Sequence, residues 1–178
     1  MKKLIAAFVG SMALAAAPVA LSAEATKELK MAYDADPVTL DIHEQLSGGI
    51  LQLSHMTFDP LLRWTKDLGF EPRLAESWTR VDENTMRFKL REGVKFHSGN
   101  ELTTADVKFT FDRLKQSQDF KAIFKPFSGI NIIDDYTFEL VTSEPYPLLL
   151  NTATYIFPFD SEFYSGQTED GKDKSAIL

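Results

Sequence analysis

The stretch TMRFKLREGVKFHSGNELTTADVKFTFDRL, residues 85–114, determines the fold that the sequence predicts. Its first six residues alternate between polar and apolar side chains: the even positions from Met86 to Leu90 are apolar, and the odd positions from Thr85 to Lys89 are polar. A period of two is typical of a strand with one face against a core and the other in water. Residues 85–90 are therefore predicted to form a half-buried strand.

Two turns and a helix follow that strand. Gly93 interrupts the alternation, Val94 and Phe96 resume it as a predicted short second strand, and Ser98-Gly99-Asn100 breaks the chain again. Thr103 is the predicted N-cap of a helix, with the carboxylate of Asp106 three residues later as a variant of the capping box. An apolar stripe at i, i+4 and i+7 completes this helix: Val107, Phe111 and Leu114.

The remaining chain continues as a mixture of short strands and short helices, which predicts the α/β class with a local α+β topology. The other predicted elements are a strand at Leu29–Tyr33, a helix from Gly49 to Phe58, a strand at Leu61–Trp64, an extended bridge at Phe70–Trp78 anchored by Leu74 and Trp78, a short helix within Gln116–Lys125, a hairpin at Ile130–Thr142 with its turn at Asp134-Asp135, and a helix at Leu148–Asn151.

Several motifs make the chain resemble the bacterial extracellular solute-binding proteins of family 5, the peptide, nickel and opine-type receptors of ABC importers. The matching segments are Leu74-Ala75-Glu76-Ser77-Trp78, the run from Phe88 to Gly99, Thr104-Ala105-Asp106-Val107, Phe58-Asp59-Pro60-Leu61, and Leu40-Asp41-Ile42-His43, in which isoleucine replaces the proline of the family pattern. The resemblance extends from about Leu29 to Tyr164.

The resemblance implies part of a two-lobed type II periplasmic-binding-protein-like fold, first lobe only. Such receptors usually need roughly 500 residues, well above the size of a single core, so residues 24–178 are expected to be the incomplete N-terminal part of the family 5 domain. It also implies the substrate-binding component of an ABC importer, a monomer that captures an oligopeptide or a similar small solute and delivers it to membrane permease subunits. A nickel or metal-chelate receptor and an opine-type receptor are the nearest alternatives.

The N-terminus is typical of a signal peptide. Lys2 and Lys3 precede an apolar run that ends at Pro18, and small residues at Ala23 and Ala25 offer cleavage sites. Residues 1–23 are therefore predicted to be removed after export to the periplasm, with a membrane anchor as the alternative. Because the chain contains no cysteine, it has no site for a lipid anchor and no structural disulfide.

Composition narrows the classes of partner. The chain has 178 residues, of which 44% are hydrophobic and 12% aromatic, enough for one real core. A formal charge of −7 without a basic patch disfavours nucleic acid and anionic membranes.

Candidate binding residues come from the resemblance. In the family, the loop after the first strand lines the ligand cleft, and the matching positions are Gln45, Leu46, Ser47 and Gly48. Small residues and glycines let backbone N–H and C=O groups approach a ligand, but the same loop is also explained as a plain strand-to-helix connection. Tyr155 matches a second region near the family cleft, and an aromatic residue in TYIFPF is equally explained as core.

Nothing in the sequence points to catalysis. It contains no Gly-x-Ser-x-Gly elbow and no phosphate-binding glycine loop, and His43, His55 and His97 have no metal-ligand spacing. No catalytic residue, metal site or cofactor is therefore expected. Two other classes remain open, a stand-alone secreted hydrolase or adhesion module and a membrane-anchored sensor.

Overall fold

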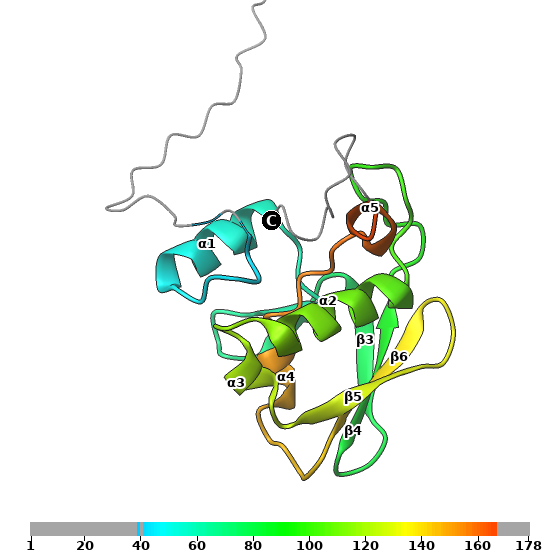
Figure 1. The fold of residues 1–178 in the computed structure, drawn as a ribbon. Helices are drawn as coiled ribbons and strands as arrows, with labels where there is room; N and C mark the ends of the chain where they lie inside the picture. Colours follow the sequence, from blue (N-terminus) through cyan, green and yellow to red (C-terminus); the bar gives the residue numbers. More distant parts are fainter. Residues whose placement is uncertain (1–38, 40, 167–178) are drawn as a thin grey trace, which may run out of the picture. The chain divides into compact units, whose positions relative to one another are not determined.

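Two antiparallel sheets and several short helices make up residues 41–166, which with residue 39 are the part of the chain that the computed structural model describes (Figure 1). The elements are α1 Gly48–Thr57, β1 Leu62–Trp64, β2 Phe70–Pro72, β3 Ala75–Arg80, β4 Thr85–Leu90, α2 Thr104–Gln116, α3 Lys121–Phe124, β5 Phe127–Ile132, β6 Thr137–Thr142, α4 Leu149–Ala153 and α5 Ser161–Tyr164.

The larger sheet has the strand order β3-β4-β6-β5, so the predicted strand β4 lies inside it. The register places Phe88 opposite Phe138, and their stacked rings lie 5.3 Å apart between centroids on the buried face. On the other face Arg87 and Glu139 are cross-strand partners, with Nη2 and Oε1 2.7 Å apart. The alternation in the sequence thus produces one apolar and one charged face, as predicted.

Helix α2 covers the apolar face of this sheet, as Figure 1 shows, and its N-terminus has the predicted cap. The backbone N–H of Thr103 donates to Asp106 Oδ2 at 2.7 Å. The stripe of Val107, Phe111 and Leu114 is at most 1% exposed. Burial of each such side chain contributes roughly 1.5–3 kcal/mol, so this helix is held chiefly by the sheet beneath it.

The hairpin formed by β5 and β6 is confirmed, with Asp134-Asp135 in its turn. Asp134 Oδ1 accepts from the N–H of Tyr136 at 2.8 Å, the usual role of aspartate in a turn. The turn also contacts the start of α2, because Thr104 donates from Oγ1 to Asp134 O at 2.8 Å and from N to Asp135 O at 2.9 Å.

The prediction of a second strand at Val94 and Phe96 is wrong. This segment folds back on itself as a loop with a single isolated bridge between Lys95 and Glu101. Its two bends lie at Gly93 and Gly99, whose φ angles of +73° and +97° are costly for other residues. Two closely spaced bends leave too few extended residues for a strand, although Val94 and Phe96 still pack against the core.

The predicted bridge at Phe70–Trp78 instead holds strand β2 and the first part of β3, which continues to Arg80. Strand pairing with β1 and β4 satisfies its backbone groups, which the composition alone did not indicate. Leu74 and Trp78 do pack against the core, as predicted. The signal peptide predicted at residues 1–23 and the strand predicted at Leu29–Tyr33 lie outside the described residues. Within residues 41–166, none of the helices is long and apolar enough to cross a membrane.

Candidate functional site

The loop that leads into α1 is fixed at its base by buried polar residues. Asp41 and His43 are 1% and 0% exposed. Asp41 forms an ion pair with Arg113 of α2, and its Oδ1 accepts from the N–H of His43 at 2.9 Å. These contacts explain the Asp41-Ile42-His43 part of the family motif as the anchor of the loop.

His43 is neutral in this setting. Its Nε2 lies 3.1 Å from the carbonyl oxygen of Phe157, so that nitrogen carries the proton and donates, and its ring stacks on Phe159 at 4.1 Å. Burial, with the nearby guanidinium of Arg113 as a second cause, lowers the pKa of His43 to about 3. The imidazole therefore has a structural role at neutral pH.

The four predicted cleft residues follow this anchor and differ in exposure. Gln45 and Leu46 are half-buried, and Leu46 packs against the main core. Ser47 and Gly48 are exposed. Ser47 is the N-cap of α1, with Oγ 3.4 Å from the N–H of Ile50, and a Cβ added to Gly48 would meet no atom within 4 Å. The exposed end of this loop therefore has open space in front of it.

Tyr155 lies on the chain that follows α4 and is half-buried against the same core as Leu46. A hydrogen bond of 3.0 Å from the N–H of Leu61 to the carbonyl of Ile156 fixes this segment beside the start of β1. The ring of Tyr155 meets that of Phe120 edge-on, with centroids 6.1 Å apart.

The connection between α2 and α3 links the two predicted regions. Asp119 Oδ2 accepts from the N–H of Leu46 at 2.8 Å, and the next residue, Phe120, contacts Tyr155. Sequence reasoning missed both residues, because they lie in a polar segment predicted only as irregular with a short helix. Asp119 therefore joins Gln45–Gly48 and Tyr155 in one candidate binding surface, which we call the cleft wall, and the buried ring of Phe120 packs beneath it.

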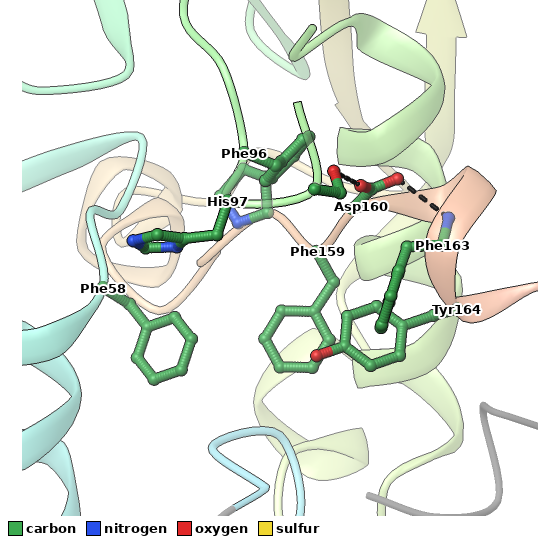
Figure 2. Close-up of a pocket in the computed structure, with 9 residues that line it drawn as sticks. Phe58, Phe96, His97, Phe159, Asp160, Phe163 and Tyr164 are labelled. Carbon is green, nitrogen blue, oxygen red and sulfur yellow. Dashed lines mark hydrogen bonds between the residues drawn. The ribbon is translucent and has the colours of Figure 1, made fainter. Parts of the chain in front are cut away.

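Apart from the cleft wall, a hollow of about 400 Å³ is lined mainly by aromatic side chains (Figure 2). One of them, Phe159, is the ring on which His43 stacks. The lining of this hollow comes from the end of α1, the loop before α2 and the chain around α5: Phe58, Phe96, His97, Ser98, Pro158, Phe159, Asp160, Phe163 and Tyr164. Figure 2 shows the rings of Phe159 and Tyr164 side by side, and their centroids lie 5.1 Å apart.

Asp160 is the carboxylate of this aromatic hollow. Burial by itself would raise the pKa of Asp160, but hydrogen bonds from Ser98, the N–H of Phe163 and the amide of Asn100 hold it below its usual value. The N–H of Phe163 lies 2.9 Å from Oδ1, so Asp160 also caps α5. A carboxylate that is ionised and already bonded suits a structural role better than acid or base chemistry.

Another hollow, of about 410 Å³, lies along α1 and shares Phe58 with the aromatic hollow. Its lining is almost wholly apolar and includes Ile42, Ile50 and Leu53.

Across residues 41–166, no group of three or more His, Cys, Asp or Glu side chains is placed to hold a metal ion.

Comparison with known proteins gives the family. Residues 69–177 match the model described as "Bacterial extracellular solute-binding proteins, family 5 Middle". The chain belongs to this family. The resemblance found in the sequence is thereby confirmed, and a family of solute receptors agrees with the expectation that the chain is not an enzyme.

Curated family 5 relatives are several times longer than this chain. The glutathione-binding protein GsiB of Escherichia coli K12 is 26% identical over 145 residues, which are 79% of this chain and 28% of GsiB. An uncharacterized protein of Bacillus subtilis, YhjP, is 35% identical over 95 residues, which are 52% of this chain and 16% of YhjP.

Solved family 5 receptors share the fold. An ABC transporter substrate-binding protein from Sinorhizobium meliloti has a TM-score of 0.62 and 28% identity, covering 74% of this chain and 28% of its own. Haemophilus influenzae OppA, in complex with the peptide RPPGFSPFR, has a TM-score of 0.68 and 20% identity, covering 76% of this chain and 31% of its own. The predicted fold class, mixed α and β as part of a type II periplasmic-binding-protein-like fold, is confirmed.

Proposed function

We propose that this chain is part of the substrate-binding component of an ABC importer, which captures oligopeptides or similar small solutes and delivers them to the permease. The observation that carries the proposal is that two consecutive residues join the two regions predicted to approach the ligand: Asp119 bonds to Leu46, and the buried Phe120 packs against Tyr155. The family match supplies the receptor class. The relatives support a peptide, since GsiB is named for glutathione and OppA holds RPPGFSPFR.

The proposed contacts are Gln45, Leu46, Ser47, Gly48 and Tyr155. The exposed Ser47 and Gly48 leave room for a ligand to approach the backbone, and main-chain contacts tolerate different peptide side chains. In this proposal the cleft wall supplies one side of the site. A second lobe closes on the solute and buries most of its surface, and the permease recognises the closed form.

The proposed setting is the periplasm of a Gram-negative bacterium. Export would use residues 1–23, with cleavage after Ala23 or Ala25, and the absence of cysteine from the sequence leaves no lipidation site. The receptor would act as a soluble monomer. Such a protein can diffuse between the solute and its membrane partner.

Metal-chelate and opine receptors share this fold. NikZ from Campylobacter jejuni, solved with Ni(L-His), has a TM-score of 0.55, and AgaA, solved with agropinic acid, has a TM-score of 0.64. The cleft wall offers backbone, amide and carboxylate groups and an aromatic ring, a set that suits a peptide.

The test is calorimetric titration of the native protein purified from the periplasm of its source bacterium, after its intact mass has been measured. Probes are tri-alanine, glutathione, nickel with L-histidine, and agropinic acid. We expect at least one peptide to bind with a Kd of ~1 µM or tighter. If only the nickel complex or only the opine binds, that solute takes the place of the peptide as the proposed ligand. If none of the four probes binds, the proposal is refuted.

A further inference from the structure

Asp119 presents a carboxylate at the edge of the cleft wall. The residue is exposed, on the connection between α2 and α3. Its Oδ2 accepts the N–H of Leu46 at 2.8 Å. This bond fixes the carboxylate beside the loop that ends in the exposed Ser47 and Gly48. Among the described residues the second oxygen, Oδ1, has no hydrogen-bond partner, which leaves it available to a ligand.

No basic side chain of the described residues forms an ion pair with Asp119. The basic residues of the same segment have other partners. Arg113 pairs with the buried Asp41, Lys115 Nζ donates to the carbonyl of Phe127 at 3.0 Å, and Lys121 Nζ donates to Gln118. The negative charge of Asp119 is therefore not balanced by its own helix segment.

Two further acceptors precede Leu46 in the loop that Asp119 binds. Gln45 Oε1 is shielded from solvent and has no hydrogen-bond partner within the described part of the chain. Glu44, one residue earlier, is exposed. The loop and the α2–α3 connection therefore combine acceptors and negative charge.

We propose that Asp119 makes the cleft selective for solutes with a positively charged group, an ammonium or a guanidinium, on the part that contacts this wall. The inference rests on the proposed function. When a cleft closes and expels water, an unpaired carboxylate favours a cationic partner and disfavours a neutral or anionic one. In a peptide, the charge can belong to the N-terminus or to a lysine or arginine side chain.

The experiment compares four peptides on the native protein and on Asp119→Asn. Ala-Lys-Ala against Ala-Met-Ala reports a side-chain charge, and tri-alanine against its N-acetyl form reports the N-terminal charge. Asparagine is nearly isosteric, and its amide oxygen can still accept the N–H of Leu46. Glu83→Gln, an exposed carboxylate in the β3–β4 turn, is the matched control for loss of one charge.

We expect the unchanged protein to bind the charged member of at least one pair roughly 10-fold more tightly. In Asp119→Asn that ratio should fall to about 1, while Glu83→Gln should keep it. The pair that shows the effect identifies the source of the charge. Raising NaCl from about 50 mM to about 500 mM should also reduce the ratio in the unchanged protein, a readout that needs no variant.

Two results would overturn the inference. One is an unchanged protein that binds both members of each pair equally, and the other is a preference that Asp119→Asn retains in full. Failure of the proposed function gives a different result, because the unchanged protein would then bind none of the four peptides.

Discussion

Asp41 and Arg113 form an ion pair between the loop before α1 and helix α2, with side chains that are 0% and 16% exposed. The guanidinium of Arg113 also lies over the ring of Phe159, 5.7 Å from its centroid. This pair therefore connects the anchor of the cleft wall to the aromatic hollow.

Removal of one partner of this pair should destabilise the protein strongly. We expect Arg113→Met to lower the free energy of unfolding by about 3–5 kcal/mol, because the buried carboxylate of Asp41 loses its counter-charge. Urea denaturation measures the loss. The double variant Asp41→Asn with Arg113→Met should lose less than the sum of the two single variants. Additive losses would show that the two side chains act independently.

Stability should also depend on pH through His43. The pKa of its imidazole is about 3 in the folded protein and 6.5 in the reference state. Above pH 6.5 both states are neutral and the contribution is complete, and as the pH falls toward 3 only the unfolded chain takes up the proton. We expect about 2 kcal/mol less stability at about pH 5 than at about pH 7.5, measured by urea denaturation.

The matched control for this pH dependence is the exposed His97. His97→Gln should leave the change with pH intact, whereas His43→Phe should remove most of it. Burial also lowers the pKa of His55, followed by the charges of Arg63 and Arg73, so a smaller dependence should persist in His43→Phe. A full dependence in that variant would rule out His43 as the cause.

Gly48→Val tests the cleft wall directly. Because a Cβ at this position meets no atom within 4 Å, the melting temperature should stay nearly unchanged. The added side chain should occupy space that the ligand needs and weaken peptide binding by ~10-fold or more. Gly129→Val, which also meets no atom within 4 Å, is the control in β5. Equal peptide affinities of the Gly48→Val and Gly129→Val variants would show that Gly48 does not contact the ligand.

Gly93→Val should destabilise the protein by about 1–3 kcal/mol, the usual range for strained backbone. The φ of Gly93 is +73°, and no atom lies within 4 Å of an added Cβ, so the loss comes from the backbone alone. Thermal denaturation should show no comparable loss in Gly129→Val. A Gly93→Val protein that melts like the original would mean that the loop adopts another turn.

The 178-residue chain expressed by itself should bind tri-alanine more weakly than ~1 µM. A cleft receptor buries most of its ligand between two walls, and the cleft wall described above is one. Calorimetry on the isolated chain gives the answer. Micromolar or tighter binding would show that this wall is sufficient by itself.

Periodic patterns in the sequence predicted those strands and helices that bury one face and expose the other. The alternation in Thr85–Leu90 and the capped apolar stripe from Thr103 to Leu114 show in the sequence which side chains are buried. Strand β4 and helix α2 were therefore identified. Strands β2 and β3 were missed because pairing with β1 and β4 holds them, which their own sequence does not indicate. The bends at Gly93 and Gly99 prevented the strand expected between them.

The sequence predicted only part of the candidate site. The motif resemblance gave the loop at Gln45–Gly48 and Tyr155. The partner of the loop, Asp119, lies 73 residues from Leu46 in the chain, and a single exposed aspartate in a polar segment has no local signature. Contacts of this kind depend on the tertiary fold.

The order β3-β4-β6-β5 has a consequence for how the chain folds. The β3–β4 and β5–β6 hairpins each join neighbouring strands and can form quickly, whereas Arg87 and Glu139, which pair across β4 and β6, lie 52 residues apart. Closing so long a loop is slow compared with forming a hairpin. We therefore expect the docking of the two hairpins, with α2 between them in the chain, to limit the folding rate, so that substitutions at the β4–β6 seam slow folding more than equally destabilising ones at the β3–β4 turn.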